Sequence, residues 1–424
     1  MSEEKNNLCI LIPTYNRSNA VDYYLENKLN LFRELHFDVV LYDSSKNTLT
    51  RDVAEKYIKQ GYHCLKYVSY EDLPDDLYGT AKTANALVQC ADDYDYVWLC
   101  GDQAVLKLEE YQDELLQLLT DGFDVIHVYI NKLGRSSEQD INYKDFFKDF
   151  FWSMTHFCAF ILSGRVIKQM EQWMKKYLEM NCTMAIVFPI FAVLPSETFR
   201  IAYINHAAFE PSPCRTLASS AQNKEMLRGY AEAINIGVDN LPEEYNDVKS
   251  ITKKSFCKNT GHFDWQSAID LRADGNLILE SMKKYGKYLK QMTDVPLSWF
   301  YLWSIMPRKI ARRHSNFYSV YVEGINKLCE INKKGGRLIL YGAGQHGIRI
   351  LEKIKYSYPE IKVVAVSDKN WSQINREYQS IPPEDIPQYE SDYIGIAIVN
   401  PRIYKEVKKM LLKLHVPVKK LFHV

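Results

Sequence analysis

The chain has 424 residues, a length that predicts two or three domains and rules out a single minimal module. Its 53 Lys and Arg balance 53 Asp and Glu, so the formal net charge of +0 argues against the broad positive surface of a nucleic-acid-binding protein. The 46% hydrophobic and 25% charged residues are ordinary values for a globular protein. Nine scattered cysteines without a C-x-x-C pair predict neither a disulfide framework nor a zinc ribbon, and they indicate a reducing compartment.

The N-terminal part alternates between short apolar strands and helices. Continuous apolar runs at 8–13 and 38–42 predict buried parallel strands, and the helix-period pattern at 18–35 predicts the helix that connects them. The alternation continues with a strand at 63–68, a helix at 80–90 and a strand at 96–100. This order predicts a parallel α/β layer, which we expect to form one domain over residues 1–225.

The rest of the chain divides into a helical part and a second α/β part. Residues 226–332 carry helix patterns that are interrupted near Pro242, Gly261, Pro296 and Pro307, and we expect a helical linker on the acceptor side there. A new alternation follows: a strand at 337–341, a glycine-rich turn, a helix, strands at 362–367 and 393–399, and a helix from Tyr404. This predicts a smaller α/β domain over residues 333–424.

No targeting or membrane-spanning segment is predicted. The N-terminal MSEEKNN lacks the basic and apolar regions of a secretory signal. The best apolar candidate, 184–194, is only about 11 residues long and contains Pro189. We therefore expect a cytoplasmic protein, with peripheral membrane contact left open.

Polar residues follow the strands at one expected edge of the N-terminal sheet. In open parallel sheets, ligands bind at the carboxyl ends of the strands, so these residues are expected to converge. An acid after the second strand suits hydrogen bonds from a base or ribose, and an acid after the strand at 96–100 suits a divalent cation beside a diphosphate. The pattern predicts a nucleotide site formed by Pro13, Thr14, Tyr15, Asn16, Arg17, Asp43, Ser44, Ser45, Lys82, Asn85, Asp102 and Gln103.

These four motifs, in this order, resemble the family 2 glycosyltransferases of the GT-A fold. That family typically reads I-P-T-Y-N-R, then a strand ending D-x-S, then a Lys/Arg-x-x-Asn helix, then an Asp-x-Asp strand end, and the first element matches letter for letter. The likeness covers residues 8–215. It implies transfer of a sugar from a nucleotide-sugar donor, a UDP-sugar being favoured, to a glycan or a lipid-linked polysaccharide precursor. It also implies that the nucleoside is surrounded by Thr14, Tyr15, Asn16, Asp43 and Ser45.

The chain departs from the family pattern at the metal site and at the catalytic base. The resemblance implies a divalent cation, Mn²⁺ or Mg²⁺, but one acid, Asp102, stands where the family has paired acids, and Gln103 is a neutral oxygen ligand at best. His206 follows a predicted strand where some GT-A enzymes place a metal-binding histidine, so Asp102 and His206 are the expected metal ligands. The stretch 180–189, where the family has its base, contains no acid, which leaves the base unassigned among Asp145, Asp149, Glu179 and Glu210.

Other interpretations compete with these assignments. A non-catalytic protein that binds nucleotide sugars or carbohydrates for assembly is the rival hypothesis, because the acid pair is incomplete and the base is missing. Lys82 and Asn85 share a helix with apolar residues, so a solvated helix face competes with a binding site. His127 and His156 lie among apolar residues and are expected to be core histidines.

The C-terminal part has a motif of its own. G-A-G-Q-H-G at 342–347 lies between a predicted strand and a predicted helix, which is the context of a phosphate-binding turn, and an acid follows the next strand. The segment resembles the small Rossmann modules attached to bacterial sugar-modifying enzymes and sugar acyltransferases. The resemblance implies a second nucleotide at Gly342, Gly344, Gly347 and Asp368, while a structural role in docking or in a homo-oligomer stays open beside it.

An aromatic segment precedes a basic one within the helical part. Residues 298–307 contain seven aromatic or large apolar residues, and 308–314 contain four Lys or Arg. Aromatic rings beside cations suit the boundary of lipid headgroups. A core helix followed by a solvated basic turn is the competing interpretation.

Overall fold

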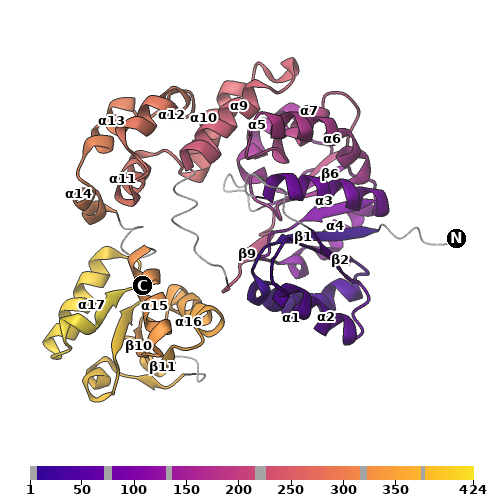
Figure 1. Ribbon diagram of the computed structural model, residues 1–424. Helices are drawn as coiled ribbons and strands as arrows, with labels where there is room; N and C mark the ends of the chain where they lie inside the picture. The colour runs from indigo at the N-terminus through magenta and orange to yellow at the C-terminus, as the bar shows by residue number, and fades with distance from the viewer. Residues whose placement is uncertain (1–6, 71–78, 130–135, 215–225, 316–321, 374–377) are drawn as a thin grey trace. The chain divides into compact units, whose positions relative to one another are not determined.

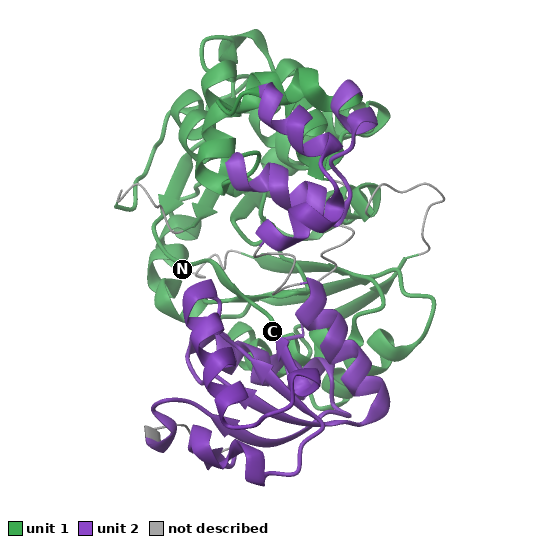
Figure 2. Ribbon diagram, turned by 90° about the vertical axis from the view of Figure 1, so that its left-hand side faces the viewer, with its two compact units in different colours: residues 1–212, 226–264, 284–296 green, residues 213–225, 265–283, 297–424 purple. Residues whose placement is uncertain are grey.

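The computed structural model describes residues 7–70, 79–129, 136–214, 226–315, 322–373 and 378–424. The chain forms two compact units, which Figure 2 colours separately. The first unit contains residues 1–212, 226–264 and 284–296, and the second contains 213–225, 265–283 and 297–424. The helical region expected at 226–332 is therefore divided between the two units instead of forming a separate linker.

The first unit is a mixed α/β structure (Figure 1). Its main sheet has seven strands in the order β3-β2-β1-β4-β7-β6-β8. Strands β1, β2, β3 and β4 are parallel, β7 is antiparallel to both β4 and β6, and β8 is parallel to β6. A separate antiparallel pair joins β5 and β9. The strands are β1 (Leu8–Thr14), β2 (Asp38–Asp43), β3 (Leu65–Ser69), β4 (Tyr96–Leu99), β5 (Ala104–Leu106), β6 (Val125–Val128), β7 (Phe160–Ser163), β8 (Ile201–Ile204) and β9 (Phe209–Pro211).

Helices surround this sheet and extend the unit into an α-helical part. The helices that lie wholly in the first unit are α1 (Ser18–Glu34), α2 (Leu49–Lys59), α3 (Thr80–Asp93), α4 (Gln112–Thr120), α5 (Tyr143–Met154), α6 (Gly164–Glu179), α7 (Val187–Val193), α9 (Ala233–Asp239) and α10 (Lys249–Thr260). Helix α12 (Leu279–Met292) has residues in both units. Shorter turns are the 3-10 segments η2 (Leu108–Glu110) and η4 (Glu243–Tyr245) and the π-helical η3 (Leu227–Glu232).

Strand β1 is buried on both faces because a helix covers each of them. Ile10 and Ile12 belong to one hydrophobic core together with Leu25 of α1. Cys9 has the opposite orientation along the strand and lies beside Cys90 of α3, with the two Sγ atoms 4.0 Å apart. This two-sided cover explains why the strand is a continuous apolar run and not an alternating one.

The second unit contains a five-stranded parallel sheet of order β12-β11-β10-β13-β14. Its strands are β10 (Arg337–Tyr341), β11 (Lys362–Ser367), β12 (Ser380–Ile381), β13 (Tyr393–Ile396) and β14 (Leu421–His423). Its helices are α11 (Trp265–Asp274), α13 (Leu297–Ile305), α14 (Arg308–His314), α15 (Gly324–Lys334), α16 (Gln345–Ser357) and α17 (Pro401–Lys413), with 3-10 turns η6 (Trp371–Gln373), η7 (Pro383–Gln388) and η8 (Val418–Lys420).

The core of this second sheet includes a helix that the sequence-based boundary left out. Ile325, Leu328 and Ile331 of α15 are buried in the same cluster as Leu338 and Leu340 of β10. A domain start at residue 333 would therefore cut through the core, because it falls within the last turn of α15 and not before that helix.

The helix breaks predicted for the middle of the chain are confirmed. Gly261 ends α10 with φ of 73°, Pro296 separates α12 from α13, and Pro307 immediately precedes α14. Pro242 lies between α9 and η4. Within the described part of the chain, no helix has the length and apolar character that crossing a membrane requires.

Candidate functional site

Four separate segments meet at the carboxyl edge of the first sheet. Thr14 and Asp43 are the last residues of β1 and β2 and lie opposite each other in the parallel register. Asp102 follows the end of β4, and Lys82 lies in the first turn of α3. Because β1, β2 and β4 are parallel neighbours, their carboxyl ends lie at one edge, as predicted from the sequence.

Hydrogen bonds connect these segments directly. The Thr14 hydroxyl donates to Asp102 Oδ2 at 2.8 Å, and Lys82 Nζ donates to the Thr14 carbonyl at 2.9 Å and to Ser44 Oγ at 2.7 Å. Thr14, Asp43, Ser44, Lys82 and Asp102 are all buried, and we call these five residues the strand-end cluster. Lys82 thus points into the cluster and does not belong to a solvated helix face.

A second set of bonds orders the turns after β1 and β2. Asn16 has a positive φ of 51°, and its N–H donates to Ser45 Oγ at 2.7 Å. The Ser45 N–H donates to Asp43 Oδ1 at 2.9 Å, which holds the Asp43 carboxylate against its own turn. The turn after β1 is thereby fixed against the turn after β2.

Sequence reasoning missed Tyr67, which lies on β3 beside this turn. Its hydroxyl donates to Asp43 Oδ2 at 2.9 Å, and burial together with this bond raises the pKa of Tyr67 to about 12. Strand β3 was predicted, and Tyr67 lies level with Leu41, two residues before Asp43. The strand pairing was the signal that could have identified it.

Arg17 forms an ion pair with Asp102 that the sequence did not indicate. Arg17 Nη1 lies 2.8 Å from Asp102 Oδ1, and the Arg17 side chain is 40% exposed while that of Asp102 is 3% exposed. Burial nevertheless raises the pKa of Asp102, because desolvation outweighs the opposing effects of Arg17 and Thr14. Each carboxylate oxygen of Asp102 accepts one of these hydrogen bonds, Oδ1 from Arg17 and Oδ2 from Thr14.

The remaining expected nucleotide-site residues surround the cluster less closely. Tyr15 is exposed beside the turn after β1, and Pro13 is half-buried. Asn85 lies on α3 after Lys82 and is exposed. Gln103 is half-buried, and its carbonyl accepts the Ser212 N–H at 2.9 Å, which connects the end of the β5–β9 pair to the segment after β4.

The two expected metal ligands lie at opposite ends of the β5–β9 pair. Ala104 pairs with Pro211 at the end next to Asp102, whereas His206 precedes the other end of β9. His206 stacks on Tyr111, with ring centroids 5.6 Å apart, and its Nδ1 is 4.0 Å from a Glu110 carboxylate oxygen. The described residues contain no group of three or more His, Cys, Asp or Glu placed to hold a metal ion. As described, Asp102 and His206 do not fit a shared cation site.

The four candidate bases have different surroundings. Asp145 is exposed on α5 and pairs with Lys148, and Glu179 is exposed at the end of α6. Asp149 of α5 is only 16% exposed. Glu210 is exposed on β9 and lies opposite Val105, close along the chain to Asp102. Residues 184–188 are buried and run into the start of α7, which explains why this part of the chain has no acids.

The prediction of a core histidine is confirmed for His127. It is fully buried, its Nδ1 is 2.6 Å from the Ala159 carbonyl and its Nε2 is 2.8 Å from Ser153 Oγ. Burial lowers the pKa of His127 to about 3, so the ring is neutral at physiological pH. His156 is only half-buried.

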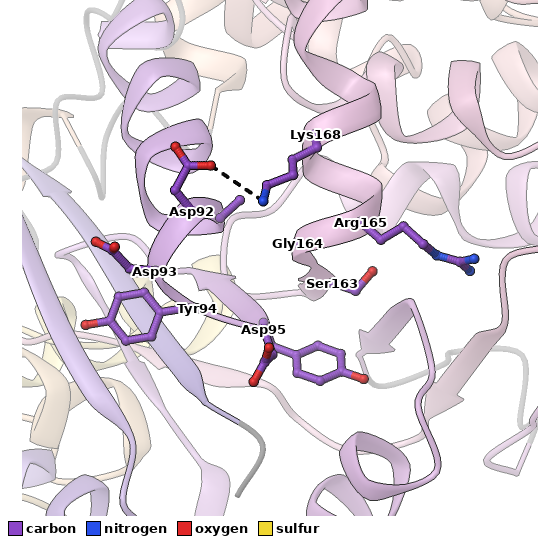
Figure 3. Close-up of a pocket in the computed structure, with 10 residues that line it drawn as sticks. Asp92, Asp93, Tyr94, Asp95, Ser163, Gly164, Arg165 and Lys168 are labelled. Atoms are coloured by element: carbon purple, nitrogen blue, oxygen red, sulfur yellow. Dashed lines mark ion pairs between the residues drawn. The ribbon is translucent and has the colours of Figure 1, made fainter. Parts of the chain in front are cut away.

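An open pocket of about 600 Å³ lies at the amino edge of the same sheet, away from the strand-end cluster (Figure 3). It lies between the end of α3, the start of β4 and the start of α6. Asp92 points toward Lys168, and the two charges are 3.5 Å apart. Gly164 follows β7 here, and its N–H donates to the Asp95 carbonyl at 2.7 Å. Arg165, which also lines the pocket, pairs with Asp124 outside it, and the lining contains none of the expected nucleotide-site residues.

Packing explains two of the three glycines of the C-terminal turn. Gly342 has φ of 106°, and a Cβ there would lie 2.8 Å from the Ala397 carbonyl oxygen. A Cβ on Gly347 would lie 1.8 Å from the Gly342 carbonyl oxygen. Gly344 differs, because its φ of −71° suits any residue and a Cβ would meet nothing within 4 Å.

Asp368 holds this turn in place. Its Oδ2 accepts the Ala343 N–H at 2.8 Å, and its Oδ1 accepts the Asn370 N–H at 3.0 Å. Gly344 precedes α16 as its N-cap and offers no side chain to the first N–H groups of that helix. Asp368 thus fixes the backbone of the turn, while no side chain caps the N-terminus of α16.

Comparisons with known proteins give a partial family match and distant structural likenesses. The family model described as C2185-like, N-terminal, matches residues 335–422. No curated protein matches the sequence. Among solved structures, S. aureus TarS 1-349 has 13% identity and a TM-score of 0.43 over 74% of this chain and 93% of that one, and a further S. aureus TarS structure has 15% identity and a TM-score of 0.45 over 74% and 55%.

A mannosyltransferase from Pyrobaculum calidifontis, in complex with GDP-Man and Mn²⁺, has 10% identity and a TM-score of 0.41 over 74% of this chain and 86% of that one. TarS 1-349 has also been solved in complex with UDP and with UDP-GlcNAc. With identities and TM-scores this low, function has to be inferred from this chain's own residues.

Proposed function

We propose that this protein is a glycosyltransferase of the GT-A type that resembles family 2 and moves a sugar from a nucleotide-sugar donor to a glycan or lipid-linked acceptor. The observation that carries the proposal is the strand-end cluster, in which Lys82 bonds both Thr14 and Ser44 and Thr14 bonds Asp102. Four motifs that are far apart in the sequence thus form one polar site at the edge where parallel sheets bind nucleotides.

The cluster offers suitable groups for both parts of a nucleoside diphosphate. Asp43 can accept hydrogen bonds from a base or ribose, and Tyr67 holds its carboxylate in position. Arg17 and Lys82 supply positive charge beside Asp102, where a diphosphate would gain from it. A divalent cation at Asp102 would share the carboxylate with Arg17, which donates to Oδ1, and with Thr14, which donates to Oδ2, and the cation stays a prediction.

Transfer requires an acceptor oxygen to attack the anomeric carbon of the donor sugar. The bond from that carbon to the diphosphate oxygen breaks, the nucleoside diphosphate leaves with the electron pair, and a base takes the proton of the acceptor hydroxyl. We propose Glu210 as this base, because it is exposed and β9 lies against the strand that directly follows Asp102 and Gln103. Asp145 is less suited, because Lys148 already pairs with it.

The experiment is a transfer and hydrolysis assay with UDP- and GDP-sugars, with and without Mn²⁺. We expect one donor to be hydrolysed slowly without acceptor, and Glu210→Gln to lower kcat at least about tenfold with donor KM unchanged. Glu34→Gln, at an exposed acid at the end of α1, is the matched control and is expected to keep full activity. Nucleotide binding without turnover of any donor would favour the rival hypothesis of a non-catalytic binding protein.

Gly344 favours a second binding function in the C-terminal unit. We propose that its missing side chain leaves room for a phosphate at the N-terminus of α16, in a Rossmann-like sheet whose order changes direction next to β10. Calorimetric titration with NAD(H), nucleotide sugars and coenzyme A tests this. If one of these compounds binds, Gly344→Val should abolish its binding. If none of them binds, a docking role for the turn is left.

A further inference from the structure

Apart from Ser298 and Ser304, helix α13 consists of aromatic and large apolar residues, and yet it is only partly covered. Its inward positions, Phe300 and Trp303, are buried. Its outward positions include Leu302, which is 45% exposed, and Ile305, which is 65% exposed. A soluble helix normally places polar residues on its solvent side, so this outward face lacks the expected composition.

Helix α14 continues this surface with positive charge. Arg308 and Arg312 turn toward α11, where they donate to the carbonyls of Asp274 and Ala273 at 2.8 and 3.3 Å. Lys309 and Arg313 are four residues apart, so they share one stripe of the helix, and both are exposed. The four cations therefore divide into two that cap α11 and two that face solvent.

The apolar and basic faces meet at the junction of the two helices. Ile305 ends α13, and Lys309 lies in the first turn of α14. Residues 295–322 contain four Lys or Arg and no Asp or Glu, so no acid in this stretch neutralises the exposed cations. We call Tyr301, Leu302, Ile305, Lys309 and Arg313 the α13–α14 patch.

We propose that the α13–α14 patch docks the protein on an anionic lipid surface. Large apolar side chains enter the boundary between headgroups and acyl chains, while neighbouring Lys and Arg attract anionic headgroups, and binding needs both contributions. Trp265 supports this assignment, because it is 55% exposed and packs edge-on against Trp299 of α13 at 5.2 Å. An indole at this position suits the headgroup level. The proposal is independent of sugar transfer.

The test is sedimentation of the full chain with phosphatidylcholine vesicles that contain or lack about a third of phosphatidylglycerol. We expect binding to the anionic vesicles that weakens as salt increases, because exposed charges are screened. Lys309→Glu with Arg313→Glu should lower the partition coefficient at least about tenfold, and Leu302→Ser with Ile305→Ser should lower it comparably.

The matched control is Ile251→Ser with Lys258→Glu. Ile251 is 54% exposed and Lys258 is also exposed, but both belong to α10 of the first unit. This control should bind vesicles like the unmodified chain, and thermal unfolding of all variants checks that they are folded. The proposal is overturned if the unmodified chain does not bind anionic vesicles, or if the charge-reversed variant binds them equally well. It is also overturned if the unmodified chain self-associates on size exclusion and the apolar variant does not, because the patch would then bind a second copy of the chain.

Discussion

Burial of Asp102 makes the stability of the folded protein depend on pH. Asp102 belongs to the proposed donor site, and desolvation raises the pKa of its carboxyl group despite the Arg17 guanidinium. A raised carboxyl pKa means that the folded state holds its proton more tightly than the unfolded state. Stability is therefore lost as pH rises from the usual value of 3.8 through the pKa of the folded protein.

Asp102→Asn should remove this pH-dependent loss. The variant keeps the shape of the side chain and carries no charge, so its stability relative to the unmodified chain should increase as the pH rises from 3.8 through the raised pKa of Asp102. Thermal unfolding of both proteins across this range measures the difference. At the same time, any stimulation of donor turnover by Mn²⁺ should disappear. A stability difference that stays constant or decreases with pH would show that Arg17 fully compensates the buried charge.

At the scale of elements, the strands that form the site could be predicted and the contacts between them could not. The runs at 8–13 and 39–42 are apolar because both faces of these strands are covered, and the polar residue that follows each run marks the edge of the sheet. The ion pair of Arg17 with Asp102 joins residues far apart in sequence, and no local pattern encodes it.

Two further contacts show the same limit of local patterns. Tyr67 reaches Asp43 only because β3 pairs with β2, and His206 is kept from Asp102 by the length of the β5–β9 pair. Periodicity also left the orientation of Lys82 open, since it shares α3 with buried alanines. Its place in the cluster follows from the packing of α3 against β1, which is a property of the folded unit.

The C-terminal turn gives a prediction at this same scale. Gly347→Ala should destabilise the second unit by about 3 kcal/mol, because the added Cβ would overlap the Gly342 carbonyl oxygen. Gly344→Ala should cost less than about 1 kcal/mol, since its Cβ meets open space and only the N-cap preference is lost. Chemical denaturation of the two variants compares them directly. Equal destabilisation would show that the turn has a different backbone path.

At the scale of the whole molecule, the division into units differs from the three predicted domains. The composition change near residue 332 is real, because strands begin again there, but α15 belongs to the sheet that follows it. Its three buried side chains contribute to the core through contacts that composition cannot show. Domain limits set by where strands begin therefore omit elements that pack against those strands from earlier in the chain.

Two fragments test this boundary. Residues 322–424 should unfold cooperatively, because they contain the five-stranded sheet and α15. Residues 333–424 should be less stable by several kcal/mol, since Ile325, Leu328 and Ile331 are lost and each buried aliphatic side chain contributes about 1.5–3 kcal/mol. Thermal unfolding followed by circular dichroism measures both. Equal stability of the two fragments would mean that α15 is dispensable.

The claim that the strand-end cluster binds the nucleotide of a donor is tested most directly by calorimetric titration of UDP and GDP into three proteins: the unmodified chain, Asp43→Asn and Asp22→Asn. Asp22 is a matched control, because it accepts the Tyr57 hydroxyl at 3.0 Å much as Asp43 accepts that of Tyr67, but on α1 and outside the cluster. We expect one nucleotide to bind, Asp43→Asn to weaken it by about 1.5–3 kcal/mol, and Asp22→Asn to leave it unchanged. No binding of either nucleotide to the unmodified chain, or equal affinity in Asp43→Asn, would contradict the account.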